Sequence, residues 1–311
     1  MKPAPLKPIR SVLSVPGNRA EMHEKARCSA ADMVMLDLED SVPPEEKKQA
    51  RQTVVRTISD LAWKDKALAV RINALDTPFG YKDAVEVAEA VGDKLDLLVL
   101  PKTNTPGDIH FLDRLLSGIE LACGHKFVLN IEAAIETAAG LNQVSAIAAA
   151  SQRLASLSFG VADYTASVGA GLASVSGHGE NDAHVYPGHR WHFPLSRMIM
   201  AAKANGCFAV DAPFGNFKDS EGLKASATMA KALGCDGKWA IHPAQIDTIN
   251  QVFSPTPEEI ERALKILKTA KEAGHTRGAV AIDGKMVDQA TIRLARRVRD
   301  HARHLGLVAA Q

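Results

Sequence analysis

Residues 33–40 read MVMLDLED, a continuous apolar run that ends in three acidic side chains. A short run without polar alternation is typical of a strand that is buried on both faces, as in a parallel sheet covered by helices. Seven further runs of this kind follow or precede it, at residues 11–17, 68–73, 95–102, 127–136, 154–163, 207–215 and 237–243. The sequence therefore predicts eight buried strands.

The segments between these runs have helical spacing. Met22, Ala26 and Ala30, for example, recur every four residues and would share one helix face. The predicted helices cover residues 19–31, 80–91, 106–120, 137–150, 194–205 and 219–234. Strand–helix alternation predicts a parallel sheet, and eight such units favour a closed (β/α)8 TIM barrel over residues 1–250. An open doubly wound sheet is the alternative, although a Rossmann domain is disfavoured because no GxGxxG turn follows the first strand.

Residues 251–311 extend beyond the predicted barrel. The sequence TPEE at 256–259 is typical of a helix start, with a hydroxyl N-cap, proline at the first helical position and glutamate at the third. Residues 278–288 predict a hairpin that turns at Asp283 and Gly284, and a last helix is predicted over 289–305. We expect this extension to reach a neighbouring subunit.

Composition excludes several classes of protein. The chain has 311 residues, 46% of them hydrophobic, and a formal net charge of +1, whereas nucleic-acid binders carry a strong basic excess. No window approaches the roughly 18 apolar residues of a membrane span. The N-terminus lacks the pattern of a signal peptide, and the four cysteines have no zinc-ligand spacing. We therefore expect a cytoplasmic protein with no nucleic-acid or membrane partner.

Charged and polar side chains close seven of the eight predicted strands. They are Asp37, Glu39, Asp40, Arg71, Asn73, Lys102, Glu132, Glu136, Asp163, Asp211 and His242. Catalytic groups of barrel enzymes lie at the C-terminal ends of the strands, and several acids at one place require a cation among them. Oxygen ligands suit magnesium, and Glu136 and Asp163 close adjacent strands, so we predict that they hold one ion. Arg71 at the same rim is predicted to neutralise an enolate or hold a carboxylate.

Three further features leave alternatives open. Lys102 at a strand end would suit a Schiff base with a carbonyl substrate instead of metal chemistry. The segment 178–192 contains His178, His184, His189 and His192, whose spacing fits no zinc template and favours a loop near the active site. Arg19 and Lys25 flank a predicted helix start after the first strand, where phosphate groups bind readily.

Several motifs, in order, resemble the HpcH/HpaI aldolase and citrate-lyase β-subunit-like family, and within it the malyl-CoA and β-methylmalyl-CoA lyases. They include RSVLSVPGNRAEMHEKA, ADMVMLDLEDSVPPEEKKQAR, VRINALDTPFGYKD, IEAAIETAAGL, LASLSFGVADYTASVGA and GKWAIHPAQID, and they span nearly the whole chain. The resemblance implies a TIM barrel, Mg²⁺ (with Mn²⁺ as a substitute), a CoA thioester substrate and a homo-oligomer, either a trimer or a hexamer.

The resemblance also implies roles for individual residues. Glu136 of IETAAG and Asp163 of GVADY would bind the magnesium ion, and Arg71 of VRIN would contact the reacting acyl group. Asp288 of DGKMVD would be an acid/base group that the neighbouring subunit's extension delivers.

Four residues would contact the CoA portion of the substrate if the resemblance holds. Arg19 and Lys25 would meet the CoA phosphates, and Ile241 and His242 would lie along the CoA.

The implied reaction is the reversible cleavage of a short 3-hydroxyacyl-CoA, such as malyl-CoA or β-methylmalyl-CoA, to glyoxylate and acetyl-CoA or propionyl-CoA. The alternatives are a citramalyl-CoA lyase that releases pyruvate and acetyl-CoA, a malyl-CoA thioesterase, and a citrate-lyase β-type subunit that works within a complex. The sequence departs from the family pattern at the His-rich segment near 172–193, which leaves the acyl group open.

Overall fold

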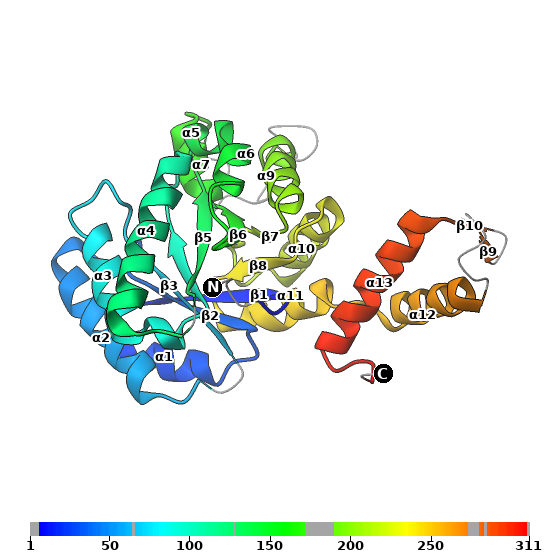
Figure 1. The fold of residues 1–311 in the computed structure, drawn as a ribbon, viewed down its shortest axis with the longest axis horizontal. Coiled ribbons are helices and arrows are strands. Elements are labelled where there is room, and N and C mark those ends of the chain that lie inside the picture. The colour runs from blue at the N-terminus through cyan, green and yellow to red at the C-terminus, as the bar shows by residue number, and fades with distance from the viewer. Residues whose placement is uncertain are drawn as a thin grey trace. The chain divides into compact units, whose positions relative to one another are not determined.

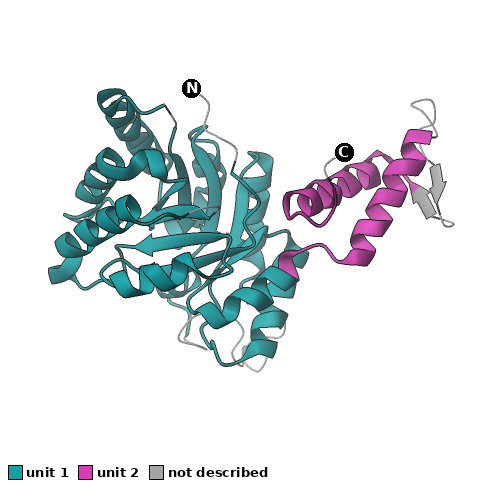
Figure 2. Ribbon diagram, turned by 90° about the horizontal axis from the view of Figure 1, so that it is seen from below, with its two compact units in different colours: residues 1–251 teal, residues 252–311 magenta. Residues whose placement is uncertain are grey.

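The computed structural model describes residues 6–63, 66–126, 128–171, 190–272, 280–282 and 285–309. The chain divides into two compact units, residues 1–251 and residues 252–311, which Figure 2 distinguishes by colour. Residues 178–189, most of the His-rich segment that was predicted to form a loop near the active site, lie outside the described part of the chain.

The first unit is a closed barrel of eight parallel strands in sequence order, surrounded by helices (Figure 1). The strands are β1 (Ser11–Pro16), β2 (Met33–Asp37), β3 (Ala67–Arg71), β4 (Leu97–Leu100), β5 (Asn130–Ile135), β6 (Leu154–Phe159), β7 (Phe208–Asp211) and β8 (Gly237–Ala240). Pairing of β1 with both β2 and β8 closes the barrel, which confirms the predicted TIM barrel and excludes an open sheet.

The barrel interior is filled by apolar side chains. Val12, Met35, Ala69, Val99 and Trp239 come from five different strands and belong to one buried cluster. All five residues of β2 are buried, as expected for a strand with helices outside and packed side chains inside. Because all strands are parallel, their C-terminal ends form one rim, called the mouth below.

The helices agree with the predictions at most positions. They include α1 (Ala20–Arg27), α3 (Gly80–Val91), α4 (Pro106–Cys123), α9 (His192–Ala204) and α10 (Ser220–Leu233). The predicted helix over 137–150 is instead two short helices, α5 (Ala138–Asn142) and α6 (Val144–Ala148).

Among the described residues, three α-helices were not predicted: α2 (Lys47–Asp60), α7 (Val161–Ser167) and α11 (Ile246–Phe253). In α2 the buried face includes Lys47 and Arg51, whose polar heads bind backbone carbonyls and carboxylates. These charged residues hide the apolar period from sequence reasoning.

The strands are shorter than predicted, and most predicted strand-end residues lie in the loops that follow. The clearest correction concerns Asp163, which was placed at the end of a strand over 154–163. Strand β6 ends at Phe159, and Asp163 lies in the first turn of α7 after Gly160. Asp163 remains at the mouth because α7 begins directly after β6.

The second unit contains α12 (Pro257–Glu272), α13 (Gln289–His304) and an antiparallel pair, β9 (Val280–Ile282) with β10 (Lys285–Val287). The antiparallel pair agrees with the predicted hairpin, whose turn at residues 283–284 lies outside the described residues. The second unit has a small hydrophobic core, formed by Ala263, Ile266, Val287, Ile292 and Ala295. Within the described chain, no helix is both long and apolar enough to cross a membrane.

Candidate active site

Arg71 is fixed at the mouth by Asp37. The two residues are register partners on β3 and β2, and both side chains are buried. Arg71 Nε donates to Asp37 Oδ1 at 2.6 Å and Nη2 donates to Oδ2 at 2.8 Å. Burial opposes ionisation of Asp37, but the charge and hydrogen bonds of Arg71 outweigh it and lower the pKa of Asp37 to about 2. The guanidinium also lies 5.5 Å from the ring of Trp239, so its plane is held from two sides.

Glu39 links this arginine to Lys102. Glu39 Oε2 lies 3.2 Å from Arg71 Nη1, and Oε1 accepts a hydrogen bond from the Lys102 ammonium. Asp40 lies beside the same pair, with its carboxylate oxygens 3.7 Å from Arg71 Nη1 and 3.7 Å from Lys102 Nζ. A continuous set of ion pairs therefore joins the ends of β2, β3 and β4.

Glu136 is buried immediately after β5. Its Oε1 accepts the backbone N–H of Lys102 at 2.6 Å, which points the carboxyl group across the mouth. Burial raises the pKa of Glu136 to about 8, with Asp163 and Glu39 adding to the rise and Arg71 opposing it. A carboxylate in this place needs a cation to stay ionised at neutral pH.

Asp163 lies on the same side of the mouth as Glu136. Its carboxylate is partly exposed, and Oδ2 lies 3.8 Å from Lys102 Nζ. The charge of Asp163 acts on the Glu136 carboxyl, so the fold brings together the two residues that were predicted to share one ion.

The mouth has the charge and the ligand chemistry for a divalent cation. Its five carboxylates, when ionised, face the three cations Arg71, Lys102 and Lys47, so two negative charges stay uncompensated. The described residues contain no group of three or more His, Cys, Asp or Glu side chains that would enclose a metal by themselves. Magnesium characteristically takes one or two carboxylates and fills its other positions with water or substrate oxygens. Glu136 and Asp163 fit that ion.

Gly160 makes room for Glu136. A Cβ at this position would lie 2.2 Å from Glu136 Oε2 and 2.4 Å from Glu136 Cβ. We expect Gly160→Ala to displace the carboxyl group and to lower kcat by about 100-fold, since a shift near 1 Å in a reacting site costs that much. Steady-state kinetics and a magnesium titration check this. Gly118→Ala, where a Cβ meets nothing within 4 Å, is the control, and equal activity of the two variants would contradict the role of Gly160.

The structure separates the two residues that were predicted to meet the CoA phosphates. Arg19 is exposed at the N-terminus of α1, next to the end of β1. Lys25 is exposed in the last turn of the same helix, about 9 Å further along its axis at 1.5 Å per residue. Arg19 therefore lies at the mouth, whereas Lys25 lies away from it.

Ile241 and His242 lie at the mouth after β8, together with an aromatic residue that sequence reasoning missed. Phe217, in the loop after β7, stacks on the His242 ring with centroids 4.6 Å apart and planes 18° apart. Ile241 and Phe217 are 44% and 45% exposed, so this group offers a flat apolar surface to a ligand. The exposure of Phe217 was the missing information, because an aromatic residue in a polar loop carries no distinctive pattern.

Asp288 lies in the second unit, where it caps α13. It accepts the backbone N–H of Thr291 at 2.8 Å and the Thr291 hydroxyl at 2.9 Å. These bonds hold the pKa of Asp288 below its ordinary value, and the side chain is exposed. A capping role accounts for its conformation, and its role as an acid/base group stays a prediction.

Other predicted strand-end residues serve the fold. Glu132 is buried in the middle of β5, where burial raises its pKa and the Ser156 hydroxyl donates to it. Asp211 pairs with the fully buried Lys238, and Asn73 donates to Asp83. These residues lie within the strands or behind the rim, so the mouth is smaller than the sequence suggested.

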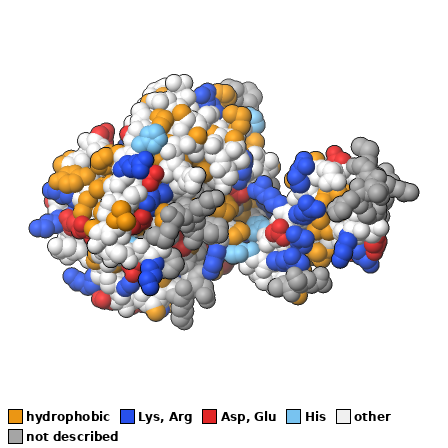
Figure 3. All heavy atoms as spheres, viewed as in Figure 1, with side chains coloured by type: hydrophobic (Ala, Val, Ile, Leu, Met, Phe, Trp, Pro, Cys, Tyr) orange, Lys and Arg blue, Asp and Glu red, His pale blue; other side chains and the backbone are white. Residues whose placement is uncertain are grey.

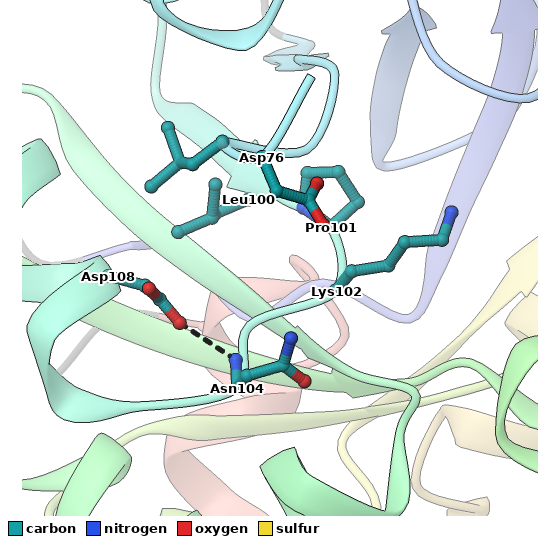
Figure 4. A pocket seen from close by; sticks show the side chains of 7 residues that line it. Asp76, Leu100, Pro101, Lys102, Asn104 and Asp108 are labelled. Carbon is teal, nitrogen blue, oxygen red and sulfur yellow. Dashed lines mark hydrogen bonds between the residues drawn. The ribbon is translucent and has the colours of Figure 1, made fainter. Parts of the chain in front are cut away.

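The Lys102 side chain is unsuited to Schiff-base formation. Burial lowers its pKa, but the hydrogen bond and charge of Glu39, with Asp40 and Glu136, raise it well above the ordinary value. A nucleophilic amine must be neutral, so these acids oppose that chemistry. A small cavity of about 60 Å³ lies beside Lys102, and it is far too small for a CoA thioester. Figure 4 shows the Lys102 side chain extending away from this cavity. The residues that line the cavity are Leu75, Asp76, Leu100, Pro101, Lys102, Asn104 and Asp108.

Comparison with known proteins agrees with this geometry. A model of the HpcH/HpaI aldolase/citrate lyase family matches residues 10–243, which contain every mouth residue described above. The chain belongs to this family. This membership confirms the family predicted from the sequence motifs.

Two curated relatives and one solved structure show where in the family the similarity lies. The chain is 42% identical to an L-malyl-CoA/β-methylmalyl-CoA lyase of Cereibacter sphaeroides over 94% of each chain. It is 35% identical to a malyl-CoA/β-methylmalyl-CoA/citramalyl-CoA lyase of Chloroflexus aurantiacus, over 96% of this chain and 89% of that one. It also resembles CitE of Mycobacterium tuberculosis in complex with magnesium, acetoacetate and coenzyme A, with a TM-score of 0.76 and 28% identity over 97% and 100% of the chains.

Proposed function

We propose that this protein is a magnesium-dependent carbon–carbon lyase that cleaves malyl-CoA or β-methylmalyl-CoA to glyoxylate and acetyl-CoA or propionyl-CoA. The observation that carries the proposal is the pairing of an uncompensated carboxylate site, Glu136 with Asp163, and a rigidly held guanidinium, Arg71, at one mouth. The similarity to lyases named for these substrates supports the choice of acyl group.

The cation would be held by Glu136 and Asp163, with Mn²⁺ as a substitute for Mg²⁺. When bound, it would supply Lewis acidity toward the oxygen atoms of the glyoxylate half. Glu136 is aimed by the Lys102 N–H and admitted by Gly160, so the ligand needs no reorganisation before it binds.

Arg71 acts on the thioester half of the substrate. As the bond between C2 and C3 breaks, glyoxylate leaves and negative charge develops on the thioester oxygen. Arg71 would stabilise this enolate, because Asp37 and Trp239 hold its planar group in a fixed direction. A flexible cation would lose part of this advantage to reorganisation.

The CoA portion would bind across the rim. Arg19 at the start of α1 would contact phosphate, and the exposed Ile241 together with the Phe217–His242 stack would pack against the apolar and aromatic parts of CoA. Lys25 would contact a CoA phosphate only if the bound CoA runs along α1, away from the mouth and toward the last turn of that helix.

A homo-oligomer would complete the site through Asp288 of a neighbouring subunit. The second unit carries eleven Lys and Arg against seven Asp and Glu, whereas the barrel unit carries twenty-six against twenty-nine. Figure 3 shows several basic side chains on the visible face of the second unit. The sequence of α13 contains Arg293, Arg296, Arg297, Arg299 and Arg303. The core of the second unit is small and Leu294 is 65% exposed, so contact with an acidic partner barrel would stabilise it.

In the condensation direction Asp288 would take the proton from the acyl-CoA carbon, and in cleavage it would return it.

Shared sites predict complementation between two inactive variants. Glu136→Gln and Asp288→Asn subunits, each inactive alone, should regain activity when they are refolded or co-expressed together. Random mixing at a ratio of one to one would leave roughly a quarter of the sites with both residues intact. Turnover of purified, differently tagged hetero-oligomers measures this. Hetero-oligomers that form and stay inactive would contradict a site shared between subunits.

The reaction itself is tested with purified protein and a panel of malyl-CoA, β-methylmalyl-CoA and citramalyl-CoA, with products read by mass spectrometry. We expect glyoxylate with acetyl-CoA or propionyl-CoA, loss of activity in EDTA, and recovery with Mg²⁺. Free malate and CoA without glyoxylate would indicate a thioesterase, and pyruvate from citramalyl-CoA alone would indicate a citramalyl-CoA lyase. Activity restricted to an acyl-carrier thioester would indicate a citrate-lyase β-type subunit.

A further inference from the structure

Lys102 has an unusual backbone conformation in this protein. Among the residues that the structure describes, it is the only one other than glycine with a positive φ, at 47°. Side chains with a Cβ rarely adopt this left-handed region, and such residues concentrate where function requires them. Thr103 follows it and ties the loop to β5 through an N–H bond to Ala134 O of 3.3 Å.

The left-handed turn gives Lys102 two separate uses. Its backbone N–H points to Glu136 Oε1 at 2.6 Å. Its side chain extends away from Asn104 and Asp108, as Figure 4 shows, and carries the ammonium to the acids at the ends of β2 and β6. One residue therefore contacts both proposed metal ligands by different atoms.

The ammonium is surrounded by carboxylates. It donates to Glu39 Oε1 and lies 3.7 Å from Asp40 Oδ1 and 3.8 Å from Asp163 Oδ2. The side chain of Lys102 is 30% exposed, so this group of charges is partly open to solvent. Two cations that lie within a few ångströms of each other in a partly buried site repel each other strongly. A divalent cation bound here would therefore compete with the Lys102 ammonium for the same carboxylates.

We infer that Lys102 is a positioning residue that holds Glu136, Glu39 and Asp163 together before the metal binds, and whose ammonium then competes with the metal for the same negative charge. This rests on the proposed metal site of Glu136 and Asp163. The consequence is a site that stays assembled without metal and binds the metal more weakly, and thus more reversibly, than its carboxylates alone would.

The test is Lys102→Met, measured for metal affinity and for thermal stability. Magnesium affinity is measured by titration calorimetry. Manganese affinity is obtained from the concentration of free Mn²⁺, which electron paramagnetic resonance measures. We expect metal binding at least about tenfold tighter than in the parent protein, because one positive charge close to the cation is gone. We also expect a lower Tm in EDTA and a larger rise in Tm on adding Mg²⁺, because the acids then repel each other until the metal arrives.

Two further variants separate the ammonium from the backbone. Lys102→Gly keeps the N–H that holds Glu136 and relieves the left-handed strain, so it should fold and also bind metal more tightly. Lys94→Met is the matched control, because this exposed lysine precedes the same strand at the opposite end of the barrel. It should bind metal like the parent protein.

The outcomes distinguish the two proposals. If the parent protein and Lys94→Met bind no metal, the proposed metal site is wrong. If they bind metal but Lys102→Met and Lys102→Gly bind it no more tightly, Lys102 does not compete with the metal and this inference is overturned.

Discussion

We expect Glu136→Gln to lower kcat for cleavage of malyl-CoA by about 1,000-fold or more at saturating Mg²⁺. The substitution keeps the shape of the side chain and an oxygen that can accept the Lys102 N–H, but it removes the negative charge that a cation needs. A metal ion contributes several kcal/mol of transition-state stabilisation, and each 1.36 kcal/mol is a factor of ten. Steady-state kinetics over a magnesium series measures the loss. Near-normal turnover in Mg²⁺ would show that the metal site is assigned to the wrong residue.

The same variant should also change how the stability of the protein depends on pH. Burial raises the pKa of Glu136 on folding from an ordinary value of about 4.5 to about 8, so the folded protein retains a proton that the unfolded chain has released. In EDTA, the free energy of unfolding of the parent protein should therefore fall as pH rises from about 4.5 to 8. Glu136→Gln removes this contribution, so its denaturant midpoint should vary less over that pH window. Glu86→Gln, at an exposed residue of α3 that pairs with Arg51, is the control for a general charge effect.

We expect Arg71→Lys to lower kcat by about 100-fold or more while the protein stays folded. Lysine keeps one positive charge beside Asp37, but it is a point charge that cannot reproduce the two parallel bonds of 2.6 and 2.8 Å and still face the substrate. Loss of one preorganised donor to a developing oxyanion typically costs a factor of 100 to 1,000, roughly. The kcat and KM of the variant, measured with malyl-CoA, separate this effect from weaker binding.

The choice of lysine matters for the interpretation. Arg71→Met would leave the fully buried Asp37 without its ion-pair partner, and breaking such a pair typically costs about 3–5 kcal/mol of stability. Loss of activity in that variant would therefore mix misfolding with chemistry. Arg71→Lys with an unchanged Tm and with kcat within tenfold of the parent protein would contradict the role of Arg71 in stabilising the enolate.

The barrel was predictable because its signal repeats. Eight apolar runs separated by amphipathic segments allow few arrangements, and parallel strands must place their C-terminal ends on one rim. Glu136, Asp163 and Arg71 could therefore be assigned to one mouth without knowledge of any distance. The family motifs supplied CoA, which no spacing of residues indicates.

Helices and interior residues were predicted less well for a physical reason. In α2, the buried Lys47 and Arg51 are stabilised by partners from other elements, so the local pattern is polar although the face is buried. Glu132 was read as a strand-end group because it is charged, but a carboxyl group held neutral by burial can lie inside the barrel.

By itself, the sequence determined the order of the strands, the barrel and the rim on which the acids gather, since these follow from the periodicity of apolar residues. Only the tertiary structure decided which charges pair. The register of β2 against β3 places Asp37 opposite Arg71, and the left-handed turn at Lys102 joins β4 to Glu136 and Glu39. These contacts link residues more than thirty positions apart and depend on distances of a few ångströms, which no local pattern in the chain records.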